Sequence, residues 1–138
     1  MSASDPLHLT LFADGGSRGN PGPAGAGAVL YDAQGREVAA ISRYLGQATN
    51  NVAEYTALNL GLAEARRLGA SEITVKMDSE LVVRQLQGSY KVKAPGLKPL
   101  YNEARRLLQG FRRATVAHVR RELNRRADEL ANQAMDRR

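Results

Sequence analysis

The sequence predicts an α/β fold in which a mixed five-stranded sheet is flanked by packed helices. Strand-like and helix-like segments share the chain, and three strands come before the first helix. The segments between the later strands are long enough for the crossovers that parallel pairing requires. No repeat or linker divides the chain, so residues 1–138 are expected to form one domain with an ordered core over about residues 7–135.

The first three strands are predicted near the N-terminus. L-H-L-T-L-F-A-D (7–14) is rich in strand-forming residues. The glycines and prolines of G-G-S-R-G-N-P-G-P (15–23) indicate a loop. A second strand follows at A-G-A-V-L-Y-D (26–32), and a D-A-Q-G turn leads to a third strand at R-E-V-A-A-I-S-R-Y-L (36–45). Residues 25–45 are therefore expected to form an antiparallel hairpin.

The first helix is predicted over residues 51–68, which contain good helix formers and end before Gly69. One stripe of this helix carries Glu54, Leu58, Gly61, Ala65 and Leu68. E-I-T-V-K-M-D (72–78) has the composition of a fourth strand. The helical segment between it and the third strand is long enough for the crossover that parallel pairing requires.

The second half of the chain is predicted to add two helices, a strand and a last helix. Ser79 can cap a short helix over residues 80–87, and another helix spans 97–109. A-T-V-A-H-V (114–119) predicts the fifth strand. Asn124 can cap the final helix. The inner face of that helix would carry Ala127, Leu130, Ala131 and Ala134.

The charge of the chain favours a polyanionic partner. The net charge is +6, and much of the excess lies late in the sequence. The arginines concerned are Arg105, Arg106, Arg112, Arg113, Arg120, Arg121, Arg125 and Arg126. A basic surface of this kind is typical of proteins that bind nucleic acid. The alternative is a set of solvated arginines on helix surfaces, which composition alone does not exclude.

Four acids occupy positions where a carboxylate is hard to accommodate. Asp14 ends the first strand, Asp78 ends the fourth, and Glu54 and Asp128 lie in first turns of helices near apolar neighbours. Burying such groups together is unfavourable, and divalent metal ions would offset it. Carboxylate oxygens suit Mg²⁺, and a pair of ions about 3.5–4 Å apart can promote phosphoryl transfer. Taken singly, each acid could instead serve as a turn former, a helix cap or a partner of a helix dipole.

Four motifs in order resemble the type 1 ribonuclease H family over about residues 7–135. They are F-A-D-G-G-S-R-G-N-P-G-P-A-G-A-G-A-V-L, T-N-N-V-A-E-Y-T-A-L, V-K-M-D-S-E-L-V and N-R-R-A-D-E-L-A-N. The resemblance implies a sheet with three antiparallel strands followed by two strands parallel to the first. It also implies metal-dependent hydrolysis of the RNA strand of RNA–DNA hybrids by an endoribonuclease.

The resemblance assigns the catalytic and metal-binding roles to the same four acids. Asp14 would contact both of two Mg²⁺ ions, with Mn²⁺ as a substitute. Glu54 and Asp78 would each hold one ion, and Asp128 would complete the second site. These are the acids that their positions in the strands and helices had already singled out.

The resemblance also implies residues that contact the substrate. Asn20, Asn50 and Asn51 resemble amides that contact the two strands in the minor groove, where 2′-hydroxyls distinguish RNA. Thr49 resembles a hydroxyl that holds a DNA phosphate. Asn20 could also be a turn residue before Pro21, and Asn50 could cap a helix.

The chain departs from the family pattern in two places. Many relatives carry a histidine in the loop before the last helix, whereas this chain has the short segment R-R-E-L-N (120–124). His118 lies earlier, in the predicted fifth strand, and is expected to be a bystander, with Arg121 or Glu122 in comparable space. The chain also has no Trp, so it lacks a basic, tryptophan-bearing helix for gripping the hybrid. That task would fall to the arginines and to Lys91, Lys93 and Lys98.

Three other functions are compatible with parts of the sequence. A duplex-binding module with little cleavage would have the same fold, but it would not need four uncompensated acids. Cleavage of RNA–RNA duplexes would be a broader activity of the same site. A dinucleotide-binding oxidoreductase is suggested by G-P-A-G-A-G (22–27), but that motif requires a helix next, and here a strand is predicted.

Composition gives simple expectations about compartment and assembly. No apolar run approaches the ~20 residues that span a membrane, and M-S-A-S-D-P-L-H-L (1–9) does not resemble a signal peptide. The chain has no Cys, which fits the reducing cytosol. A cytoplasmic monomer without membrane contact is the simplest expectation.

Overall fold

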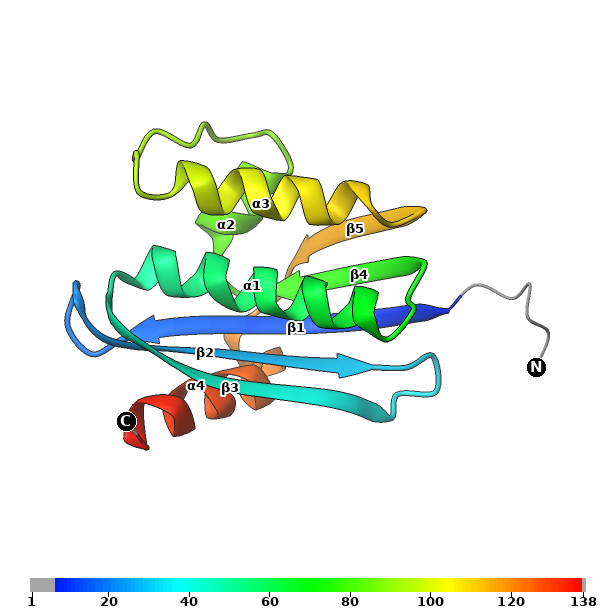
Figure 1. Ribbon diagram of the computed structural model, residues 1–138, viewed down its shortest axis with the longest axis horizontal. Helices are drawn as coiled ribbons and strands as arrows, with labels where there is room; N and C mark the ends of the chain where they lie inside the picture. The colour runs from blue at the N-terminus through cyan, green and yellow to red at the C-terminus, as the bar shows by residue number, and fades with distance from the viewer. Residues whose placement is uncertain (1–6, 138) are drawn as a thin grey trace.

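A computed structural model describes residues 7–137 and confirms the mixed five-stranded sheet (Figure 1). The strands are β1 (His8–Ser17), β2 (Gly22–Tyr31), β3 (Glu37–Ala48), β4 (Glu72–Met77) and β5 (Arg113–His118), in the spatial order β3-β2-β1-β4-β5. β2 pairs antiparallel with β1 and β3. β4 runs parallel to β1, and β5 runs parallel to β4. The predicted domain also includes residues 1–6 and 138, which lie outside the described residues.

The helices cover both faces of the sheet. They are α1 (Asn50–Arg67), α2 (Glu80–Leu86), α3 (Lys98–Gln109) and α4 (Arg125–Asp136), with a 3₁₀ turn at Arg121–Leu123. α1 packs on one face together with α3, and α4 packs on the other (Figure 1). The side chains of β1 alternate, so Leu9, Leu11 and Ala13 enter the core beneath α1. Asp14 therefore points toward the α4 face.

Two glycines in the sheet allow these helices to approach its backbone closely. A Cβ at Gly15 in β1 would lie 2.2 Å from the carbonyl carbon of Ala53 in α1. A Cβ at Gly27 in β2 would lie 2.1 Å from the carbonyl oxygen of Ala127 in α4. Real side chains do not tolerate such distances, so α1 and α4 would have to move away if either residue were larger.

The predicted loop over residues 15–23 is wrong in most of its length. β1 continues to Ser17 and β2 begins at Gly22, and the pairs run on from Gly15–Ala26 to Ser17–Ala24. Only the short segment 18–21 lies between the strands. Glycines and prolines favour turns, but ladder pairing and the close approach of α1 outweigh that preference here. β3 also extends to Ala48, three residues beyond the predicted end.

The helix starts agree with the sequence, although their caps do so only in part. Thr49 caps α1, since its Oγ1 accepts a 3.2 Å hydrogen bond from the amide of Val52. Ser79 caps α2 in the same way, through the amide of Val82 at 3.3 Å. Asn124 holds the N-cap position of α4, but its side chain makes no capping hydrogen bond. The expected cap at Asn124 is therefore wrong for the side chain.

The fold also tests two expectations from the sequence, the lack of a membrane-spanning segment and the dinucleotide-binding oxidoreductase. Among residues 7–137, no helix is both long enough and apolar enough to cross a membrane. The glycine-rich segment G-P-A-G-A-G lies inside strand β2. A dinucleotide-binding loop would have to open a helix at this point, so the oxidoreductase reading is wrong.

Candidate active site

Asp14 and Asp78 lie at the point where strands β1 and β4 stop pairing. The parallel register ends with Phe12 opposite Lys76, and each acid follows two residues later. β4 ends at Met77 while β1 continues to Ser17, which leaves space beside β1. The close approach of α1 over Gly15 brings Glu54 to the same space, from just after the first turn of that helix and not within it as predicted.

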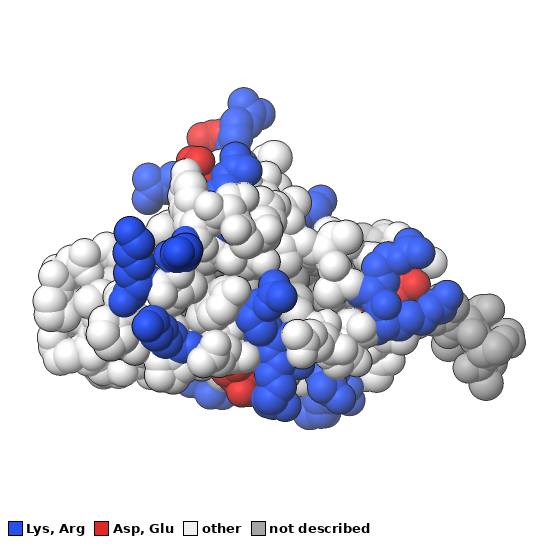
Figure 2. All heavy atoms as spheres, turned by 90° about the horizontal axis from the view of Figure 1, so that it is seen from above, with Lys and Arg blue, Asp and Glu red and all other residues white. Residues whose placement is uncertain are grey.

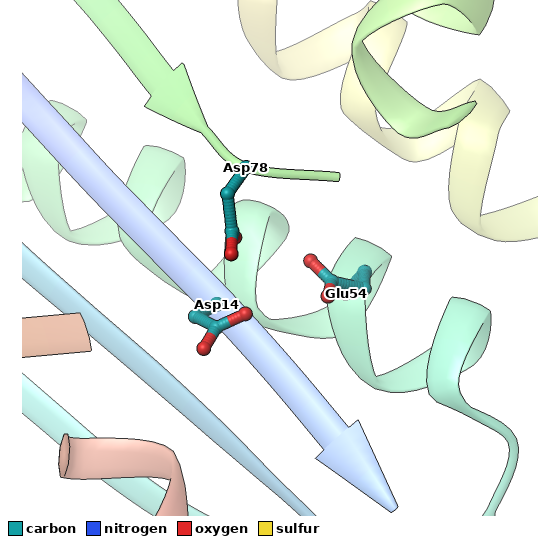
Figure 3. A group of neighbouring side chains, drawn as sticks. All are labelled: Asp14, Glu54 and Asp78. Atoms are coloured by element: carbon teal, nitrogen blue, oxygen red, sulfur yellow. The ribbon is translucent and has the colours of Figure 1, made fainter. Parts of the chain in front are cut away.

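The three carboxylates converge tightly. Asp14, Glu54 and Asp78 each offer one oxygen, and these oxygens all lie within 4.8 Å of one another. Figure 3 shows the three side chains, from β1, α1 and the end of β4, directed toward a shared space. Oxygen ligands at this spacing match what hard divalent cations require.

Burial and mutual repulsion make two of these acids hard to ionise in the absence of a cation. Burial, followed by the negative charge of Asp78 and then by Asp128, raises the pKa of Asp14 to about 8. Burial, followed by the charges of Asp14 and Asp78, raises the pKa of Glu54 to about 10. Oε2 of Glu54 is also buried and has no hydrogen-bond partner. An oxygen left in this state is a ready ligand, so the residues present fit a divalent metal.

Asp128 reaches the site from the opposite face of the sheet. It lies in the first turn of α4, whose backbone rests on Gly27, the residue paired with Asp14. Asp128 lies outside the tight group of three carboxylates. It nevertheless contributes to the raised pKa of Asp14, and it lines the same cleft. The structure thus gathers all four predicted acids in one place.

The acids open into a cleft of about 810 Å³ with a partly basic rim. Arg18, Arg120 and Arg121 contribute positive charge, and Glu122 and His118 also line the cleft. His118 lies in β5, as the sequence predicted, and is the last residue of that strand. Its position at the rim follows from its pairing with Met77 beside Asp78. Without that register, sequence alone could not place it at the cleft.

The predicted substrate-contacting residues cluster around the start of α1. Oδ1 of Asn50 accepts a 2.8 Å hydrogen bond from the amide of Ser17. Oδ1 of Asn20 accepts from the amide of Asn50 at 3.1 Å. Thr49 caps the helix, and Asn51 is half-buried in its first turn. Asn50 lines the cleft, whereas Asn20, Thr49 and Asn51 are not part of its wall.

Basic side chains extend the positive surface beyond the cleft. Figure 2 shows the face that lies at the top of Figure 1, where α3 and the loop over residues 89–96 are found. Lys and Arg side chains are spread over it, with few acidic side chains between them. Lys91, Lys93 and Lys98 are exposed, so they are accessible to a phosphate backbone.

The buried residue Asn124 was missed as a site residue. Its side chain is 1% exposed and donates to Asp78 and to the backbone of β1. The sequence signal, an asparagine before a helix, indicated a cap and nothing more.

The sheet topology, with acids converging beside β1, defines a ribonuclease H-like domain. Comparisons with known proteins agree. A family model described as reverse transcriptase-like matches residues 12–134. The N-terminal RNase H domain of Rv2228c from Mycobacterium tuberculosis is 51% identical, with 95% of each chain covered and a TM-score of 0.92. The chain belongs to the type 1 ribonuclease H family.

Two further solved structures extend the comparison. RNase H1 of the halophilic archaeon Halobacterium salinarum is 43% identical over 97% of this chain and 100% of that one, with a TM-score of 0.90. LC11-RNase H1, solved in complex with an RNA/DNA hybrid, is 44% identical over 94% and 97% of the chains, with a TM-score of 0.89. The bifunctional protein Rv2228c is longer, and this chain spans 36% of it at 53% identity.

Proposed function

We propose that this protein is an endoribonuclease that hydrolyses the RNA strand of RNA–DNA hybrids. The observation that carries the proposal is the group of one buried and two half-buried carboxylates, Asp14, Glu54 and Asp78, which meet within 4.8 Å in an open cleft. The net charge of +6 suits a phosphate backbone. A similar protein, LC11-RNase H1, has been crystallised with such a hybrid.

Asp14, Glu54, Asp78 and Asp128 would together hold two divalent cations, Mg²⁺ or in its place Mn²⁺. When bound, such a pair activates a water for attack on the scissile phosphate and stabilises the leaving oxygen. Asp14 is the central ligand in this assignment, because its pKa responds to each of the other three acids. The buried, unpartnered Oε2 of Glu54 supports the same assignment.

The other residues of the site would bind and orient the duplex. Asn20, Asn50 and Asn51 would contact the minor groove, and Thr49 would hold a DNA phosphate. The backbone amide of Ser17 donates to Oδ1 of Asn50, and the backbone amide of Asn50 donates to Oδ1 of Asn20. These bonds fix the orientation of the two side chains before substrate arrives, which reduces the entropy lost on binding. The basic rim of the cleft would contact phosphates.

A duplex-binding module with little cleavage is the main alternative. The raised pKa values of Asp14 and Glu54 weigh against it. Such groups destabilise the fold in the absence of a cation, and perturbed carboxyls cluster at functional sites. Cleavage of RNA–RNA duplexes remains a second candidate activity of the same cleft, and a cytoplasmic monomer remains the simplest form of the enzyme.

A substrate panel tests this proposal. Purified protein is incubated with end-labelled RNA–DNA, RNA–RNA and DNA–DNA duplexes in Mg²⁺, in Mn²⁺ and in EDTA. We expect cuts in the RNA strand of the hybrid, no cuts in DNA, and no cleavage in EDTA. Binding of the hybrid without cleavage under every metal condition would contradict the enzyme and favour the binding module.

A further inference from the structure

Asn124 is a buried polar residue beside the acid cluster. It lies between the 3₁₀ turn and α4, and it is 1% exposed. Its Nδ2 donates two hydrogen bonds of 3.0 Å each, one to the carbonyl oxygen of Ala13 and one to Oδ1 of Asp78. A carbonyl oxygen and an ionised carboxylate can only accept hydrogen bonds. The side chain of Asn124 must therefore turn its Nδ2, and not its Oδ1, toward Ala13 and Asp78.

The local environment of Asn124 is not explained by stability alone. Its Oδ1 is buried and has no hydrogen-bond partner, which destabilises the folded state. Its side chain also makes no capping hydrogen bond at the start of α4. A serine would cap that helix, and an apolar residue would avoid the unpaired oxygen. The asparagine is best accounted for by the two bonds it donates.

Those bonds join elements that the sheet itself leaves unconnected. Pairing between β1 and β4 ends at Phe12 and Lys76, so no ladder bond ties Asp14 to Asp78. Asn124 spans this gap from the side, through Ala13 on β1 and Asp78 beyond β4. Its backbone carbonyl accepts from the amide of Asp128 at 3.1 Å. One residue thus contacts the immediate surroundings of three of the four acids.

We propose that Asn124 is a positioning residue that fixes Asp78 and the start of α4 relative to β1, so that the acids keep the spacing needed to bind divalent cations. This inference rests on the proposed function, because it assumes that the acids bind metal. The bond to Oδ1 restricts rotation of the Asp78 carboxylate and leaves Oδ2 outside that contact. Without it, repulsion from Asp14 would turn the carboxylate away from the shared space.

Binding of Mg²⁺ to the metal-free protein, measured by calorimetry, tests the proposal without relying on activity. Residues that orient metal ligands typically contribute about 10–100-fold to metal affinity, so Asn124→Ala should weaken Mg²⁺ binding by about that factor. Asn124→Ser provides a second, polar variant. Thermal unfolding checks that each variant is folded at the temperature of the titration.

Asn59 offers a matched control. Its Nδ2 donates to the carbonyl oxygen of Leu100 at 3.1 Å, and its Oδ1 is likewise buried without a partner. It joins α1 to α3, outside the cleft lined by the acids. Asn59→Ala should therefore lower stability but leave Mg²⁺ affinity unchanged.

The outcomes separate this inference from the proposed function. Equal Mg²⁺ affinity in the wild type and in a folded Asn124 variant would overturn the positioning role alone. A wild type that binds no Mg²⁺ would overturn the metal site and the inference together. Side-chain amide resonances of Asn124 in the wild type should shift on addition of Mg²⁺ while those of Asn59 stay in place. Unmoved Asn124 resonances would overturn the role even if both variants failed to fold.

Discussion

At the scale of single residues, the cluster of acids lowers the stability of the metal-free protein. Glu54 and Asp14 are buried beside like charges, and burial is the largest cause of their raised pKa values, about 10 and about 8. A carboxyl in this state favours its protonated form in the folded chain. These two carboxyls therefore ionise at a higher pH in the folded protein than in the unfolded chain.

Glu54→Gln should stabilise the metal-free protein at alkaline pH. The unfolded chain ionises this carboxyl above its ordinary pKa of 4.5, whereas the folded chain does so only near 10. The ionisation of Glu54 therefore does not affect the free energy of unfolding below pH 4.5, and it lowers that free energy as the pH rises from 4.5 to about 10. We expect a gain of about 1–2 kcal/mol at pH 8.5. Urea unfolding in EDTA at pH 4 and pH 8.5 measures it, and an equal effect at both pH values would contradict the account.

His118→Ala should keep most of the cleavage activity. His118 lines the cleft, but it ends β5 in a regular ladder pair with Met77 and is not one of the converging acids. Steady-state cleavage of a labelled hybrid gives the comparison, with circular dichroism as the check on folding. A folded variant with activity reduced by orders of magnitude would instead make His118 part of the chemistry.

At the scale of elements, the positions of Glu54 and Asp128 depend on how closely their helices approach the sheet. Gly27 lets the backbone of α4 rest on β2, and this contact sets how far Asp128 reaches toward Asp14. Gly15 does the same for α1 and Glu54. The geometry of the acid cluster thus depends on residues that have no side chain.

Gly27→Ala should destabilise the fold and weaken metal binding together. A Cβ there would lie 2.1 Å from the carbonyl oxygen of Ala127, so α4 must shift. Overpacking of this kind costs about 1–3 kcal/mol. Denaturant unfolding and Mg²⁺ titration measure both effects. Gly96→Ala is the control, since a Cβ at Gly96 meets nothing within 4 Å. Wild-type stability in Gly27→Ala would show that α4 is not held as closely as described.

The sequence was informative about elements because their patterns are local. Strand-forming residues in 7–14 and 72–78 and the helical stripe of 51–68 predicted strands and a helix close to those observed. The loop over 15–23 was wrong because its glycines serve sheet pairing and close helix contact, which depend on distant segments. The hydrogen bond from Asn124 to Asp78 escaped prediction for the same reason, since the two residues are 46 positions apart.

Convergence of the acids was likewise beyond what spacing could establish. The sequence predicts each of the four at a strand end or a helix start, but β1 continues past Asp14 to Ser17 and the first turn of α1 holds no acid. Only the register of β1 with β4 and the approach of two helices bring them into one cleft. The resemblance to a family supplied the expectation, and the geometry supplied the physical reason.

At the scale of the whole molecule, the amount and distribution of positive charge favour binding of a polyanion. The net charge is +6, and Lys and Arg side chains spread over the face that carries α3 and the loop 89–96 (Figure 2). Binding through phosphate contacts releases counterions, so affinity falls as salt rises. This dependence is a property of the surface and does not require cleavage.

Hybrid affinity should fall roughly tenfold between 50 and 200 mM salt if two phosphates are contacted, and further with more contacts. Replacing Lys91 and Lys93 by Ala should reduce the slope of log affinity against log salt by about 1 for each phosphate that the variant no longer neutralises. Fluorescence anisotropy in Ca²⁺ or EDTA measures binding without cleavage. Arg36→Ala is the control, because Arg36 pairs with Asp32 at 2.9 Å in the β2–β3 turn, at the other end of the molecule (Figure 1). An unchanged slope in the lysine variant would remove the loop from the binding surface.

The measurement that tests the account most directly compares wild type with Asp14→Asn for both cleavage and binding of one RNA–DNA hybrid in Mg²⁺. Asp14 is buried among the other three acids. Its replacement should abolish nearly all cleavage while the protein stays folded and still binds the hybrid. Undiminished cleavage by folded Asp14→Asn would contradict the assignment of the acid cluster as the active site.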